Sequence, residues 1–234
     1  MQRYFVSIID NNVIFNDDDI HHILHVMRNR VGDHLEVVND GKVYECEITS
    51  INPLKVNILW EIPQNSELKN DLVLFMCLAK GDKLDLIIQK ATELGASKIV
   101  LVKSKRCVVN YDSKDINKKL DRFNKIAKEA SEQSHRLVIP SVLGIYDIKN
   151  IPSELLCDIN YVAYEKLADS RIEIENLSNS SVSILIGPEG GIEEKEIEVL
   201  RKQGFKPLSL GKRILRCETA AINALSVLGY LMER

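Results

Sequence analysis

Two glycine-rich loops hold the residues of this chain whose types and spacing best suit chemistry. The first, Gly187-Pro188-Glu189-Gly190-Gly191, follows the apolar run 182–186 and precedes the charged segment 193–203. Strand, glycine loop and helix in this order bring bare backbone close to a ligand. A tight turn that only needs glycine has the same pattern, so the loop by itself leaves both interpretations open.

Acidic residues in and after this loop narrow the choice of ligand. A phosphate-binding loop uses the positive end of a helix and usually a lysine. Here Glu189, Glu193 and Glu194 occupy that end, where they would repel phosphate. The pattern therefore favours a neutral or cationic ligand.

The second loop, 211–216, repeats this design between a short strand at 208–210 and a helix expected from about Glu218 to Met232. Two such loops at the C-terminal ends of neighbouring parallel strands would flank one crevice, where open α/β sheets bind ligands. Ile214 and Leu215, apolar among charges, either sandwich a planar ring or plug the core.

Length and composition limit the classes of protein to which this chain can belong. The 234 residues suffice for one large or two modest domains, and 45% apolar with 28% charged residues is ordinary for a globular chain. Five scattered cysteines without a CxxC pair argue against a disulfide framework or zinc site and favour a reducing compartment. His21 and His25 have no third ligand nearby, so we expect no metal. With no apolar leader and no candidate membrane span, we expect a cytoplasmic protein.

Charge is unevenly distributed along the chain. The net charge of −3 gives no global reason to expect nucleic acid, yet 103–136 holds ten Lys or Arg against five Asp or Glu. A basic stripe of this kind either binds a polyanion or forms a solvated helix face.

The expected elements fall into two groups. Short strands separated by turns predict a small sheet or barrel before a polar linker at 63–70. Its strands are expected at 3–9, 35–38, 43–51 and 56–60, with a helix at 20–28. Strands and helices then alternate, which predicts an α/β domain with a largely parallel sheet. Its strands are expected at 72–78, 98–102, 161–163 and 182–186, with helices at 84–94 and 115–134.

At this point the residues carry a resemblance. The segments IGPEGG (186–191) and LGKRILRCETAA (210–221) resemble the signature of the SPOUT class of RNA methyltransferases. More closely, the chain resembles the ribosomal RNA small subunit methyltransferase E family over nearly its whole length. Further matching segments are 3–6, 25–28, 32–33, 90–95, 132–136 and Pro140. The chain departs from the family at Ser104-Lys105-Arg106-Cys107, where the family commonly reads Ser-Glu-Arg-Ser, so Lys105 receives no role.

The resemblance implies a fold and an activity. It implies a PUA-like RNA-binding β-barrel over 1–70 and a SPOUT methyltransferase domain over 71–234, with a deep trefoil knot within about 182–225. It also implies S-adenosylmethionine as cofactor and a homodimer whose active site draws on both chains. The implied reaction is methylation of N3 of a uridine in 16S rRNA of the small ribosomal subunit.

Site residues follow from the matched motifs. Arg216 is the candidate to stabilise negative charge on the uracil ring, unless it only caps carbonyl groups, and Glu218 either accepts the N3 proton or orients Arg216. Arg3, Arg28, Lys80 and Arg136 are the candidate RNA contacts, or solvated surface charges. The candidate cofactor-binding residues are Leu185, Gly187, Glu189, Gly190, Gly191, Leu210, Gly211, Ile214, Leu215, Thr219 and Ala220.

Two alternatives remain beside this hypothesis. A non-catalytic RNA-binding protein, such as an assembly factor, would keep the fold without the reaction. A related methyltransferase would act on another position in RNA. The intact glycine loops, together with Arg216 and Glu218, favour an enzyme.

Overall fold

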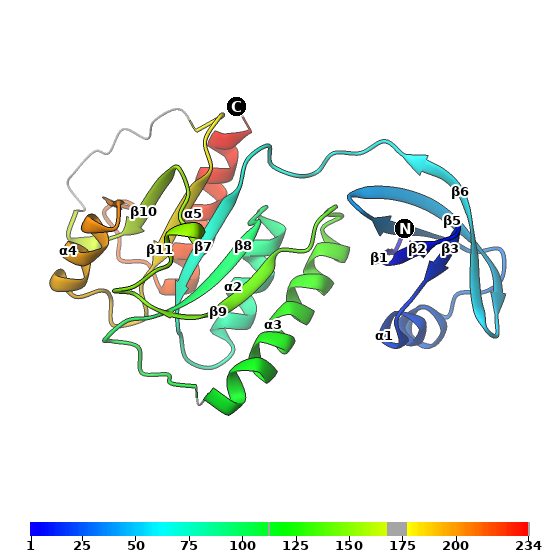
Figure 1. Ribbon diagram of the computed structural model, residues 1–234, viewed down its shortest axis with the longest axis horizontal. Coiled ribbons are helices and arrows are strands. Elements are labelled where there is room, and N and C mark those ends of the chain that lie inside the picture. Colours follow the sequence, from blue (N-terminus) through cyan, green and yellow to red (C-terminus); the bar gives the residue numbers. More distant parts are fainter. Residues whose placement is uncertain (112, 168–176, 234) are drawn as a thin grey trace. The chain divides into compact units, whose positions relative to one another are not determined.

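The computed structural model describes residues 1–111, 113–167 and 177–233 (Figure 1). These residues form two compact units. Unit 1 contains Met1–Glu67 and Ser131–Val138, and unit 2 contains Leu68–Ala130 and Ile139–Arg234. The domain boundary was expected at residue 70 with 131–138 in the second domain, whereas 131–138 belongs to unit 1.

Unit 1 is built on a four-stranded sheet with the order β1-β4-β5-β6. β1 (Arg3–Phe5) pairs parallel with β4 (His34–Asn39), which pairs antiparallel with β5 (Lys42–Ile51), and β5 with β6 (Leu54–Ile62). The single strand expected at 3–9 is wrong. Its second half, β2 (Ser7–Ile9), leaves the sheet and forms a hairpin with β3 (Asn12–Ile14).

The helix expected at 20–28 begins three residues earlier. Asn16 is its N-cap and accepts a hydrogen bond from the Asp19 N–H at 2.8 Å. α1 (Asp17–His21) continues into the π-helical turn η1 (His22–Val26). The core under the sheet is formed by Tyr4, Ile23, Leu35, Val37, Cys46 and Ile48.

Unit 2 is an α/β domain with a six-stranded, wholly parallel sheet in the order β12-β10-β11-β7-β8-β9. The parallel sheet expected from the alternating elements is confirmed. The strands are β7 (Leu72–Cys77), β8 (Lys98–Lys103), β9 (Ser141–Asp147), β10 (Ile159–Ala163), β11 (Val182–Ile186) and β12 (Phe205–Leu208). β9 was not foreseen, and β12 begins three residues before the strand expected at 208–210.

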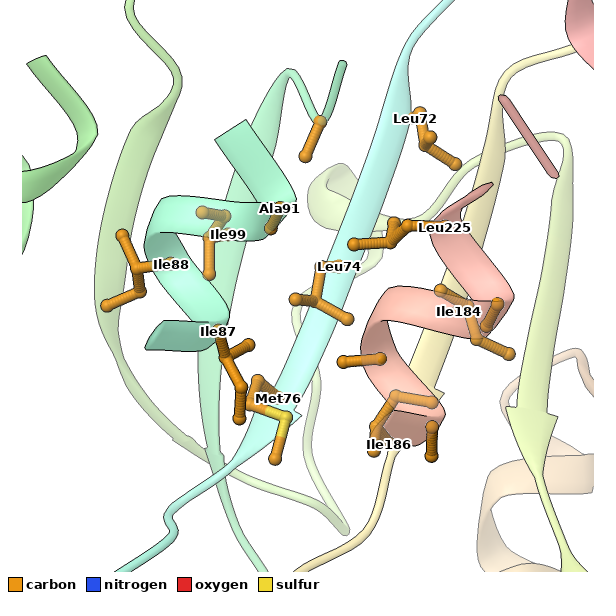
Figure 2. Close-up of a cluster of buried hydrophobic side chains, with 14 of the residues drawn as sticks. Leu72, Leu74, Met76, Ile87, Ile88, Ala91, Ile99, Ile184, Ile186 and Leu225 are labelled. Carbon is orange, nitrogen blue, oxygen red and sulfur yellow. The ribbon is translucent and has the colours of Figure 1, made fainter. Parts of the chain in front are cut away.

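Helices cover both faces of this sheet. They are α2 (Lys83–Glu93), α3 (Ser113–Gln133), α4 (Glu194–Lys202) and α5 (Cys217–Met232), with short 3-10 turns η2 (Ser153–Leu155) and η3 (Glu165–Leu167). Alternate residues of β7 face opposite layers. Leu74 and Met76 point toward α2 and α5 (Figure 2), whereas Phe75 packs with Ile197 and Leu200 of α4. Burial on both faces explains the continuous apolar sequence of the strand.

Candidate active site

The first glycine loop leaves the sheet at the end of β11 and enters α4. The Gly191 N–H donates to the Pro188 carbonyl at 2.9 Å, and Gly191 has a φ of +70°, which favours glycine. A Cβ at Gly187 would lie 2.8 Å from Cγ1 of Ile192, so a side chain at position 187 would require Ile192 or the loop to shift. Glu193 and Glu196 form a capping box that starts α4. The glycines are therefore needed for close packing, which a simple surface turn does not require.

The second glycine loop runs from the end of β12 to the start of α5. Gly211 has a φ of +107°, and the Arg216 carbonyl accepts the Ala220 N–H at 2.8 Å as α5 begins. One expectation needs correction here, because the two loops do not follow neighbouring strands. β10 lies between β11 and β12, and its last residue, Ala163, with Tyr164 and Glu165 after it, lines the cavity together with the two loops.

A cavity of about 500 Å³ lies between the two loops and the end of β10. This volume is within the ordinary range of small-molecule sites. The residues that line it are Lys83, Ala163, Tyr164, Glu165, Ile186, Gly187, Pro188, Glu189, Gly190, Gly191, Ile192, Leu210, Gly211, Arg213, Ile214, Leu215, Arg216, Cys217 and Ala220.

Most of the expected cofactor-binding positions line this cavity, with two exceptions. Leu185 is fully buried in the core on the α4 side of the sheet, and its neighbour Ile186 lines the cavity instead. The alternation of side chains along β11 accounts for the difference. Thr219 is exposed in the first turn of α5 and does not line the cavity.

Protein cations compensate the acidic groups of the first loop. Glu189 Oε1 accepts hydrogen bonds from the Lys83 ammonium and from the Lys80 N–H, each at 3.0 Å. Burial raises the pKa of Glu189, but these hydrogen bonds outweigh it and hold the pKa below its ordinary value. A hydrogen bond from Lys105, 3.0 Å away, likewise lowers the pKa of Glu193. These carboxylates therefore organise the loop, and because protein cations pair with them, their charge selects the ligand less strongly than the sequence predicts.

Arg216 and Glu218 lie together at the start of α5. The exposed Arg216 lines the cavity, and within the described ranges no carboxylate lies within ion-pair distance of its guanidinium. The Glu218 carboxylate accepts from its own N–H and from the Cys217 thiol at 3.2 Å, with Lys83 and Arg216 nearby. These groups lower the pKa of Glu218, so it is a charged and weak base at neutral pH.

The four expected RNA contacts separate into two pairs. Arg3 and Arg136 are 2% and 4% exposed. Arg3 donates to Glu36 at 2.9 Å and to the His135 carbonyl, and Arg136 donates to Glu67 at 3.1 Å. We therefore correct these two assignments: burial and internal pairing make both arginines structural in unit 1. Arg28 in unit 1 and Lys80 in unit 2 are exposed.

Most cations of the basic segment 103–136 lie in α3. Some of its cations bind within unit 2, since Arg122 pairs with Asp85 and the Lys119 ammonium lies 5.6 Å from the centre of the Tyr111 ring. Lys114 and Lys118 are exposed. In the part of the chain that the structure describes, no three His, Cys, Asp or Glu side chains form a metal-binding group, and no helix is long and apolar enough to cross a membrane.

Sequence reasoning missed Lys83, Ile186, Arg213 and the end of β10 as parts of this cavity. A signal for Lys83 was present. Gly81, with a φ of +61°, turns the chain after β7 just as glycine does after β11 and β12. A third glycine turn after a parallel strand points to the same edge of the sheet. The end of β10 carries no glycine, so its place in the cavity wall could be found only from the order of the strands in the sheet.

Comparison with known proteins agrees with this geometry. The model of the RNA methyltransferase domain family matches residues 66–229, and the model of the RNA methyltransferase PUA domain family matches residues 15–59. The fold and the site thus define an RNA methyltransferase with an accompanying PUA domain.

Individual relatives narrow the class. The chain is 38% identical to ribosomal RNA small subunit methyltransferase E of Bacillus subtilis, covering 100% of this chain and 98% of the relative. It is 34% identical to the protein of that name from Rickettsia conorii, covering 90% and 86%. The Neisseria gonorrhoeae protein, solved bound to S-adenosyl methionine, superposes with a TM-score of 0.86 at 29% identity over 99% and 98% of the chains. The chain belongs to the ribosomal RNA small subunit methyltransferase E family.

Proposed function

We propose that this protein uses S-adenosylmethionine to methylate N3 of a specific uridine in 16S rRNA of the small ribosomal subunit. One observation carries the proposal: two glycine loops enclose a cavity of small-molecule size with Arg216 at its edge. The family name supports ribosomal RNA as substrate, and the cofactor in the Neisseria gonorrhoeae structure supports the methyl donor. The assignment of N3 as the methylated atom rests on the resemblance of the two glycine-loop motifs to the family signature alone.

The residues of the cavity fit this cofactor. Backbone at Gly187, Gly190 and Gly191 lines the cavity, and a Cβ at Gly191 would lie 3.1 Å from Oε1 of Glu165, another residue of the cavity wall. Ile214 is 88% exposed although it is apolar, which suits contact with a flat ring. Backbone at Leu210 and Gly211 forms the opposite wall. When bound, S-adenosylmethionine supplies an electrophilic methyl group on a positively charged sulfur.

Residues of the chain then prepare the uridine. As the N3 proton leaves, negative charge spreads to the ring carbonyl oxygens, where the Arg216 guanidinium would stabilise it. Glu218 is a weak base because its pKa is lowered, so we leave the N3 proton to water; the Glu218 carboxylate pairs with Lys83 and adds only a nearby charge beside Arg216. Positioning of the two reactants supplies most of the remaining rate enhancement. A target base in folded RNA must be unstacked or already unpaired to enter the site.

The finer fold also belongs to this proposal. We infer a PUA-like barrel in unit 1, a trefoil knot within about 182–225 and a homodimer that completes the active site. Apolar side chains on the solvent side of α5 support the dimer, because Val227 and Tyr230 are 43% and 54% exposed. Light scattering with size exclusion tests the dimer, and a monomer at micromolar concentration would contradict it.

Two measurements test the reaction. Calorimetry should detect S-adenosylmethionine binding, and absence of binding at millimolar cofactor would contradict an enzyme and favour a non-catalytic RNA-binding protein. Mass mapping of 16S rRNA from a deletion strain, before and after addition of the protein, should reveal one uridine that gains a methyl group. A methyl group gained at another base would favour a related methyltransferase with a different target. If no base gained a methyl group, 16S rRNA would not be the substrate.

A further inference from the structure

Lys83 contacts acidic groups that belong to two different walls of the cavity. It is the first residue of α2, and it lines the cavity. Its ammonium lies 3.0 Å from Oε1 of Glu189, in the first glycine loop, and 3.8 Å from Oε2 of Glu218, in the first turn of α5. One cation from a third element therefore connects the loop after β11 to the helix after β12.

The surrounding charges hold Lys83 in this position. The hydrogen bond to Glu189 raises the pKa of Lys83 against the opposing effect of burial, so its ammonium stays charged at neutral pH. The groups that face it are Glu189 from the first loop, and Cys217 and Glu218 from α5. The Lys80 N–H also binds Glu189, so this carboxylate is held at two points, one in the turn after β7 and one at the start of α2.

We propose that Lys83 is a positioning residue for the cofactor cavity, which ties the first glycine loop to the start of α5 and so fixes the separation of the two walls. The inference rests on the proposed function, since the ligand held between these walls is S-adenosylmethionine. A single partly exposed ion pair is weak in water. A cation shared by two carboxylates acts instead by reducing the number of conformations in which the walls stand apart, which favours binding.

The test measures S-adenosylmethionine affinity by calorimetry in full-length variants. Lys83→Met should bind the cofactor roughly three- to tenfold more weakly, and Lys83→Arg should recover most of the loss because it keeps the charge. Adding Glu189→Gln to Lys83→Met should cause little further loss, since both changes remove one shared contact.

Lys90→Met is the matched control. Lys90 lies on the same helix, its ammonium is 2.8 Å from Glu93, and its side chain is 36% exposed against 33% for Lys83. It does not line the cavity, so its loss should leave cofactor affinity unchanged. Wild-type affinity in Lys83→Met, an equal loss in Lys90→Met, or additive losses with Glu189→Gln would each overturn the proposal.

A second readout separates this proposal from the proposed function. If the wild-type protein failed to bind S-adenosylmethionine, the proposed function would fall, and titration of the Glu189 carboxyl by ¹³C NMR would still decide the role of Lys83. Lys83→Met should raise the pKa of Glu189, and Lys83→Arg should restore it. An unchanged titration in Lys83→Met would show that Lys83 does not hold this carboxylate.

Discussion

Among single residues, Arg216 combines an exposed cation with a place in the cavity wall. We expect Arg216→Ala to bind S-adenosylmethionine normally and to lose about 100- to 1,000-fold in turnover, as when one charge-stabilising donor is removed from a transition state. Calorimetry measures the first quantity, and methyl incorporation into RNA measures the second. Equal loss of binding and turnover would make Arg216 a structural residue instead.

Cys107 is a second residue with a measurable property. A hydrogen bond from the Cys77 thiol, with others from Ser104, lowers the pKa of Cys107 to about 6, and the proton of the pair stays on the buried Cys77. Since thiolate is the reactive form, alkylation by iodoacetamide should increase as the pH rises through about 6 and then level off.

Mass spectrometry of the labelled protein, from mildly acidic to mildly alkaline pH, measures this profile. Cys77→Ala should move the midpoint upward, because it removes the hydrogen bond that favours the thiolate. Cys157 is an internal control: burial raises its pKa to about 11, so it should stay unlabelled in this range. A midpoint for Cys107 near that of a free thiol would contradict the assignment.

Among elements, the first glycine loop depends on the absence of a side chain at Gly187. Gly187→Ala would place a Cβ 2.8 Å from Ile192, so the loop must shift. We expect a loss of about 1–3 kcal/mol in the free energy of unfolding, as for other overpacked sites, together with weaker cofactor binding. Urea denaturation and calorimetry measure the two effects.

Gly144→Ala provides the comparison. Its new Cβ would lie 3.9 Å from Cδ1 of Leu120, which is ordinary contact, and Gly144 in β9 does not have a positive φ. Stability and cofactor affinity should both stay near wild type. If Gly187→Ala left stability and cofactor affinity as unchanged as Gly144→Ala does, close packing would not explain why position 187 is a glycine.

Local sequence predicted those elements whose pattern is set by near neighbours. The apolar run of β11 ends at its glycine loop as expected, and α5 begins within one residue of the expected start. The order of the strands is decided by pairing between distant segments, so β10 between β11 and β12 was not predictable from spacing. The same limit applies to Lys83, whose partner Glu189 lies 106 residues away in the chain.

Burial of charged side chains was a second reason why sequence-based predictions were wrong, beside the pairing of distant strands. Arg3 and Arg136 carry the residue type that binds RNA, and nothing in their local sequence indicates that each is enclosed. Their partners come from distant positions, 33 residues away for Glu36 and 69 for Glu67. Residue type alone therefore did not place these two arginines, whereas the backbone pattern of the two glycine loops correctly indicated that both lie at one cavity.

At the scale of the whole molecule, Arg136 joins two separate segments of unit 1. Its guanidinium donates to Glu67, and Glu67 also accepts the Leu137 N–H at 2.7 Å. Arg136→Met should lower the free energy of unfolding by about 2–4 kcal/mol, because it leaves a half-buried carboxylate without its cation. Chemical denaturation followed by circular dichroism measures the change.

Lys42→Met serves as control in the same unit. Lys42 pairs with Glu61 at 3.2 Å on the exposed surface, with about half of each side chain in solvent. Water screens such a pair, so its removal should have little effect on stability. Equal effects of the two substitutions would mean that the Arg136 pair does not close unit 1.

The two-segment construction of unit 1 also sets an order of events during synthesis. Arg3 donates to the His135 carbonyl across 132 residues, and Leu137 packs with Val38 and Val43. Residues 1–67 are made before 131–138, so part of their packing surface is completed only after β7, α2, β8 and most of α3 have been made. The first segment of unit 1 therefore cannot finish packing by itself, because Val38 and Val43 are covered only when Leu137, just after α3, has been made.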